Sequence, residues 1–100
     1  MGSRLFSFVE TVMAAIVKSI PCPDGVWTPI SAGEASVAFL WRDDTGYGKW
    51  TVSDTEPSVD TDDYMTLRPK HPQSLNDLAI SDRIWVMSFV ETQKIEVVTS

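Results

Sequence analysis

Short stretches in which apolar and polar residues alternate, separated by turn-forming residues roughly every ten positions, constrain the fold of this chain most. The strongest stretch covers residues 83–90, and its two interleaved faces are Trp85, Met87, Phe89 and Ile84, Val86, Ser88, Val90. Alternation with a period of two is typical of a β-strand, because successive side chains point to opposite faces of a sheet. About seven or eight such stretches predict an all-β chain, folded as one small antiparallel β-sandwich or barrel.

Proline, glycine and acidic residues mark the ends of the expected strands. We expect strands over 12–20, 26–31, 36–42, 49–53, 64–68, 83–90 and 94–99, and a short strand or a turn over 77–82. The connections are interpreted as a break at 21–25, a hairpin loop at 43–48, an acidic surface loop at 54–63, a loop at 69–76 and the turn of a last hairpin at 91–93.

Two strands carry a more specific expectation. Val37, Phe39 and Trp41 share one face of the strand over 36–42. Pro29 has no N–H to donate to a neighbouring strand, so the strand over 26–31 is expected at a sheet edge or with a β-bulge.

The N-terminal segment is expected to lie outside the sandwich. Phe6, Val9 and Met13 begin an apolar stripe with helical spacing. Residues 1–13 are therefore interpreted as a helix or an arm, and residues 14–100 as the β-domain. We expect the stripe to grip a neighbour, so deletion of residues 1–11 is expected to abolish assembly.

The charge pattern disfavours some partners. The chain of 100 residues, a length typical of one domain, carries a net charge of −6. Nine acidic residues in the segment 21–63 are balanced there only by Arg42 and Lys49. Nucleic acids and anionic membranes bind clustered Lys and Arg, and the sequence has no such cluster, so neither is an expected partner.

Residues for catalysis or metal binding are sparse. His71 is the only histidine and Cys22 the only cysteine, whereas nucleophilic and metal sites need several such groups together. We interpret His71 as a solvated loop residue and Cys22 as a partly buried thiol. The acidic loop lacks the glycine and the closing glutamate of an EF-hand, although calcium stays an alternative to a solvated acidic face. We therefore expect no catalytic, metal or cofactor site and no enzymatic activity.

Four tryptophans are many for a chain of this length. Trp41, Trp50 and Trp85 lie within alternating stretches and are expected in the core or in a subunit interface. Trp27 adjoins the Asp-Gly turn, which makes it the best candidate for an exposed tryptophan. Exposed aromatic side chains can anchor an interface or stack on sugars.

The order of strands and turns resembles a known group of proteins. The segments are VKSI (17–20), DGVWTPISAGE (24–34), SVAFLW (36–41), KWTVSDTEPSVD (49–60), YMTL (64–67) and DRIWVMS to IEVV (82–98). Over residues 14–100 this pattern resembles the small β-sandwich virion proteins of tailed bacteriophages that serve as capsid decoration, cement, or head and tail fibre subunits.

The resemblance implies a structural role without catalysis. It implies an oligomer, often a homotrimer, that is assembled in the host cytoplasm and attaches in the virion to other proteins, such as the major capsid or tail proteins. It transfers no functional residues to individual positions. From the residues themselves, the expected interaction set is Phe6, Val9, Met13, Trp27, Tyr47 and Tyr64.

Two other functions stay open. In a carbohydrate-binding or receptor-binding module, Trp27, Tyr47 and Tyr64 would form the binding platform. In a small acidic inhibitor that mimics nucleic acid, the acids of residues 54–63 would bind a basic partner.

Overall fold

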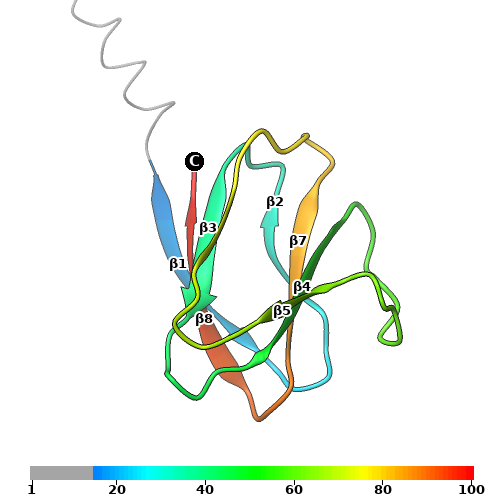
Figure 1. The fold of residues 1–100 in the computed structure, drawn as a ribbon. Coiled ribbons are helices and arrows are strands. Elements are labelled where there is room, and N and C mark those ends of the chain that lie inside the picture. Colours follow the sequence, from blue (N-terminus) through cyan, green and yellow to red (C-terminus); the bar gives the residue numbers. More distant parts are fainter. Residues whose placement is uncertain (1–14) are drawn as a thin grey trace, which may run out of the picture.

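The computed structural model describes residues 15–100, which form eight β-strands and no helix. The strands are β1 (Ile16–Cys22), β2 (Thr28–Ala32), β3 (Val37–Trp41), β4 (Gly48–Ser53), β5 (Met65–Leu67), β6 (Gln73–Leu75), β7 (Arg83–Ser88) and β8 (Gln93–Thr99). The predicted all-β class is confirmed, and the fold is a small β-sandwich (Figure 1).

Two antiparallel four-stranded sheets make up the sandwich. One sheet has the strand order β1-β8-β3-β6 and the other β2-β7-β4-β5. Among strands that follow one another in the described chain, only β4 and β5 pair with each other, and every other connection crosses from one sheet to the other. This strand order is that of an eight-stranded jelly roll.

The two predicted hairpins at 43–48 and 91–93 are wrong. β3 and β4 lie in different sheets, and so do β7 and β8. Alternation shows which face of a strand is buried, but it contains no information about which strand lies beside it. Connections of a few residues are long enough to span the roughly 10 Å between packed sheets.

One predicted loop and one predicted strand end are also wrong. The loop expected at 69–76 contains β6, which is short and has no apolar alternation but pairs with β3, for example at Val37 and Leu75. The break expected at residue 21 comes later, because β1 continues through Pro21 to Cys22. β1 is an edge strand, where a proline interrupts no ladder hydrogen bond. Of the two structures expected for 77–82, the turn is confirmed at residues 80–81, and no strand forms there.

The prediction for Pro29 is confirmed. Its strand, β2, lies at the edge of its sheet, and the register with β7 shifts between Pro29 and Ser31. At an edge or at a register shift, no neighbouring strand needs a hydrogen bond from the N–H that Pro29 lacks.

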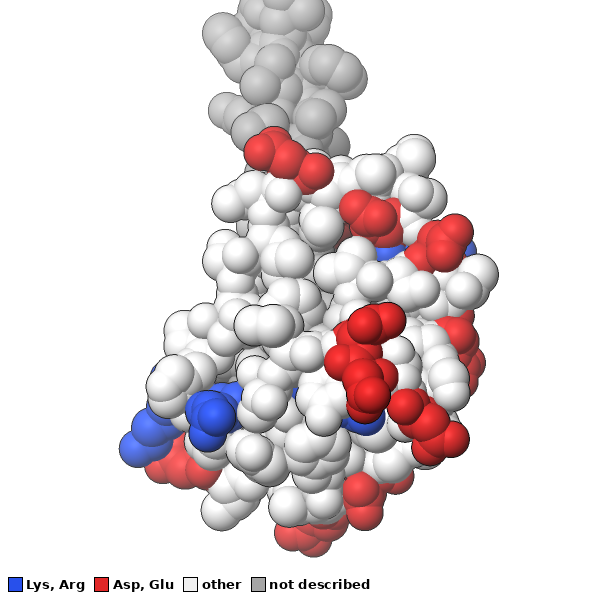
Figure 2. Space-filling view, turned by 45° about the vertical axis from the view of Figure 1, so that its right-hand side comes forward, with Lys and Arg blue, Asp and Glu red and all other residues white. Residues whose placement is uncertain are grey.

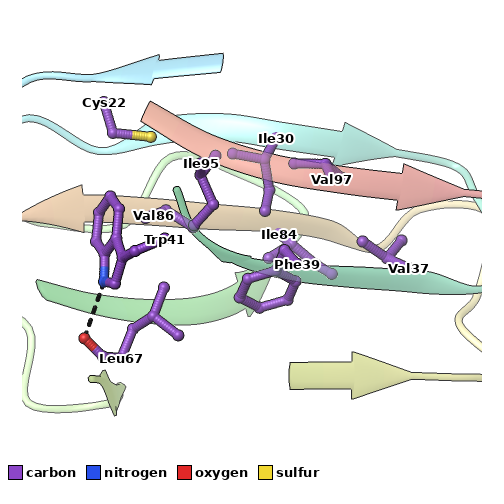
Figure 3. Packing of buried hydrophobic residues seen from close by; sticks show 10 residues of the cluster. All are labelled: Cys22, Ile30, Val37, Phe39, Trp41, Leu67, Ile84, Val86, Ile95 and Val97. Atoms are coloured by element: carbon purple, nitrogen blue, oxygen red, sulfur yellow. Dashed lines mark hydrogen bonds between the residues drawn. The ribbon is translucent and has the colours of Figure 1, made fainter. Parts of the chain in front are cut away.

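The main core lies between the two sheets (Figure 3). Val37, Phe39 and Trp41 on β3 are buried together, as their shared face indicated. Side chains from β7 and β8 meet them, and Trp41 Nε1 donates a hydrogen bond of 3.0 Å to the Leu67 carbonyl on the opposite sheet. Full burial of each large apolar side chain contributes roughly 1.5–3 kcal/mol to folding.

Candidate functional site

A group of aromatic rings surrounds Lys49 on the outer face of the β2-β7-β4-β5 sheet. The ammonium nitrogen of Lys49 lies 5.1 Å from the ring centroid of Trp27, 4.4 Å from that of Tyr64 and 5.8 Å from that of Phe89. Tyr47 joins the group because its ring packs edge-on against Phe89, with 5.4 Å between centroids. We call these five residues the Lys49 cluster.

The position of Lys49 follows from the pleat of β4. Trp50 and Val52 pack against the main core, so Lys49 and Thr51 face outward. Lys49 is nevertheless only 7% exposed, because the aromatic rings cover it. Attraction between an ammonium group and an aromatic face contributes about 0.5–2 kcal/mol, and more when water is excluded.

Trp27 of this cluster also belongs to a second buried apolar group. Trp27, Trp85 and Met87 form a buried group separate from the main core. Trp27 Nε1 donates a 3.0 Å hydrogen bond to the carbonyl of Ser58, and Trp85 Nε1 donates one of equal length to that of Ser53. The Trp27 bond fastens the acidic 54–63 loop to this face of the sheet, whereas Ser53 belongs to β4.

The expectation of an exposed Trp27 is wrong. Trp27 is 3% exposed, because Lys49 lies over its ring and the 54–63 loop accepts its N–H. Tyr47 and Tyr64 remain 37% and 38% exposed. The structure thus gathers three of the residues selected from sequence in the Lys49 cluster, but as one buried tryptophan and two exposed tyrosines.

Sequence reasoning missed two members of the cluster, Lys49 and Phe89. The place of Phe89 in the alternating stretch 83–90 suggested a strand position, whereas β7 ends at Ser88 and Phe89 begins the next loop. The backbone N–H of Phe89 donates to the Tyr47 carbonyl at 2.8 Å, which brings the two aromatic residues together. Phe6, Val9 and Met13, the other residues selected from sequence, lie outside the described residues.

An open groove of about 350 Å³ adjoins the cluster at Tyr64. Its lining combines aromatic, hydroxyl and carboxylate groups from Trp50, Thr51, Val52, Asp63, Tyr64 and Met65. Aromatic faces beside hydrogen-bonding groups are the usual lining of sites for small polar ligands.

Neither of the residues considered for catalysis, Cys22 and His71, lines this groove. Cys22 is fully buried in the main core, and burial raises the pKa of its thiol to about 12. His71 is exposed in the β5–β6 connection, with Nδ1 2.7 Å from the Pro69 carbonyl oxygen. Within residues 15–100, no three or more His, Cys, Asp or Glu side chains are placed to hold a metal ion.

The acidic side chains form a broad exposed surface. Asp54, Glu56, Asp60, Asp62 and Asp63 are all exposed. Figure 2 shows acidic groups spread over one face of the molecule with few basic groups between them. Three backbone N–H groups of the 54–63 loop bond to Ser or Thr hydroxyls two residues earlier, which stabilises its turns.

The free edge of β1 is the second surface of interest. β1 lies at the outside of its sheet (Figure 1), and most of its residues are exposed. On the outer face of this sheet Val17 lies opposite Val98, and Val98 lies opposite Ala38. We call these three residues the outer row. Val17 is 73% exposed, so the row ends at the free edge of β1 with an uncovered apolar side chain.

The part of the chain that the structure describes has no helix of the length and apolarity needed to span a bilayer. No protein-family model matches the sequence, and no curated protein sequence matches it either.

Proposed function

We propose that this chain is a non-enzymatic bacteriophage virion protein, a decoration, cement, or head or tail accessory subunit that assembles with copies of itself and with other virion proteins. The observation that carries the proposal is the combination of a closed jelly-roll core with a long, exposed edge strand and an uncovered outer row. A surface of this kind is suited to adding another polypeptide to the sheet.

Two further features support a structural role. Eight-stranded jelly rolls are common in viral capsid domains, although they also occur in lectins and cupins, so the fold is an argument by analogy. The environment of Cys22 also argues against a role as a catalytic nucleophile, because its thiol is buried and protonated at neutral pH.

Purified particles of the virus that encodes the chain test this proposal. An antibody raised against the isolated protein should label intact particles in electron micrographs, and the chain should co-sediment with them through a density gradient. A chain found only in the soluble fraction of the infected cell, never on particles, would overturn the proposal.

A carbohydrate-binding or receptor-binding module is the second candidate. It is favoured by the groove beside Tyr64, which is lined by aromatic, hydroxyl-bearing and acidic residues, among them Tyr64, Thr51 and Asp63. Sugars are bound by this combination of an aromatic face with hydrogen-bonding groups.

A glycan array with the wild-type chain and two variants tests the second candidate. Tyr64→Ala removes the ring at the groove and should abolish any binding, whereas Val59→Ala changes an exposed residue that does not line the groove and should retain it. An array without hits, or hits that persist in Tyr64→Ala, would exclude a sugar site in this groove.

A further inference from the structure

The four free edges of the two sheets differ in how far they are protected from pairing. β5 and β6 have three residues each, and β2 contains Pro29 and a register shift. Short strands, proline and bulges are the usual protection of an edge against pairing with another chain. β1 has seven residues and pairs with β8 in unbroken register from Ile16 to Cys22, and its one proline, Pro21, lies next to its C-terminal end. It is the one long and regular edge in the described part of the chain.

The hydrogen-bonding groups of β1 that face the free edge can be assigned from its neighbours. Arg42 N–H donates to the Lys94 carbonyl, so the backbone groups of Lys94 point toward β3 and away from β1. Pro21, which lies opposite Lys94, therefore faces the free edge. With a period of two, the N–H and C=O groups of Ser19 and Val17 also face the free edge.

We infer that β1 pairs antiparallel with β1 of a second copy of this chain, about a twofold axis that passes beside Val17. Val17 then lies opposite Val17 of the second copy, and Ser19 lies opposite Ala15. The two outer rows join into one apolar row that runs across the β1-β8-β3-β6 sheets of the two copies, from Ala38 of one copy to Ala38 of the other.

The charges of the strand favour this register. The chain carries −6 overall, but β1 contains no acidic residue and only one charge, on Lys18. An axis beside Lys18 would place two ammonium groups directly opposite each other, which is unfavourable. An axis beside Ser19 would place Pro21, which has no N–H, opposite Val17. With the axis beside Val17, Lys18 lies opposite the exposed Ile16 of the second copy and its apolar stem can cover that side chain.

This inference rests on the self-assembly part of the proposed function and specifies its contact. Because the contact is twofold, it predicts pairs of chains, whereas the resemblance to phage proteins implies a trimer. A contact of about five residues per strand buries less surface than a standard interface, which buries about 1,200 Å² or more. The fraction of paired chains is therefore expected to rise with concentration.

Light scattering across a concentration series tests the contact. The wild-type chain should rise from 11.1 kDa to twice that mass. Val17→Asp places two carboxylates opposite each other and should remain at 11.1 kDa at all concentrations. The matched control is Met65→Asp, since Met65 is 61% exposed on the protected edge β5, and this variant should pair like the wild type. At a concentration too low for the wild type to pair, Val17→Asp should unfold at the same urea concentration as Met65→Asp, which separates lost pairing from lost folding.

Cysteine cross-linking tests the register. Directly opposite residues of a hydrogen-bonded antiparallel pair have Cα atoms about 5.5 Å apart, within the range of a disulfide. Val17→Cys should therefore form a disulfide-linked dimer under mild oxidation. Lys18→Cys should not, because it lies diagonally from its copy, roughly 7–8 Å away. The wild-type chain is the blank, since its only cysteine is buried.

The outcomes separate this inference from the proposed function. A wild-type monomer at all concentrations, a stable trimer, a Val17→Asp variant that still pairs, or cross-linking at Lys18 in place of Val17 would each overturn the β1 contact. Labelling of virus particles by the antibody would leave the virion role of the proposed function intact in every one of these cases.

Discussion

Gly48 lies beneath the indole of Trp41, where a side chain has no space. A Cβ atom at this position would collide with the Met87 carbonyl oxygen and lie 2.9 Å from Trp41 Cζ2. Gly46 is similarly close, since its Cβ would lie 2.6 Å from Trp41 Cβ. The glycines at 46 and 48 thus allow the large Trp41 side chain of the main core to pack closely against the backbone at the start of β4.

Gly48→Ala is expected to lower the free energy of unfolding by roughly 1–3 kcal/mol, because overpacking at this site must displace the Met87 backbone or Trp41. Urea unfolding followed by tryptophan fluorescence measures the change. Gly25→Ala is the comparison: Gly25 has φ of +74° but no atom within 4 Å, so it reports backbone strain without a collision. Wild-type stability of Gly48→Ala would show that the close approach is absent.

Cys22 is expected to make stability fall at alkaline pH. Burial raises the pKa of its thiol from 9.0 to about 12. Below pH 9 the thiol is protonated in both the folded and the unfolded chain, so this contribution to stability is fully present. Between pH 9 and about 12 the unfolded chain loses the proton and the folded chain retains it, so stability decreases.

Urea midpoints measured from pH 8 to pH 11 for the wild type and for Cys22→Ala isolate this effect, because all other titrating groups are common to both. The wild type should lose stability more steeply than Cys22→Ala above pH 9. Parallel pH profiles would contradict the assignment.

At the scale of elements, the 54–63 loop depends on a tryptophan far away in the chain. Trp27 and Ser58 are 31 residues apart, yet the indole N–H of one bonds to the carbonyl of the other. This bond holds the loop to Trp27, which belongs to the buried group of Trp27, Trp85 and Met87.

Trp27→Phe is expected to loosen this loop. It retains an aromatic ring but loses the hydrogen bond, worth about 1 kcal/mol, which corresponds to roughly fivefold more of the opened loop. Limited proteolysis with a glutamate-specific protease at Glu56 measures the opening. Trp85→Phe is the matched control, since its bond is to Ser53 within β4 and its loss should leave cleavage of the loop nearly unchanged. Equal cleavage rates in the two variants would refute the role of Trp27.

At the scale of the whole molecule, assembly is proposed to use two separate parts of the chain. We propose that the β1 edge pairs copies of the chain and that the apolar stripe of residues 1–13 grips a neighbour in the virion. The sandwich from residue 15 onward has its own core, so its stability should not depend on that stripe.

Deletion of residues 1–11 is expected to abolish incorporation into virus particles, because it removes Phe6 and Val9, while the pair formed through β1 persists in solution. Particle sedimentation and light scattering measure the two properties. Val17→Asp is the complementary variant, since it should abolish the pair and retain the N-terminal stripe. Particles that incorporate the truncated chain at the wild-type level would refute the role of the stripe.

Local features of the sequence were sufficient to determine the all-β class, the inward face of β3 and the edge position of Pro29. These depend on the two-residue period of a strand and on the missing N–H of proline, both of which are properties of neighbouring residues. β6 gave no such signal, because three residues without apolar alternation form a strand only through their pairing with β3.

Only the tertiary structure decided which strands are neighbours, that Trp27 is buried, and that Phe89 and Tyr64 meet over Lys49. Each of these depends on groups distant in sequence, such as the Ser58 carbonyl beside the Trp27 indole. The alternation of a strand specifies which of its side chains are buried. What covers them depends on which connections cross between the two sheets, and the packing of the whole sandwich determines those crossings.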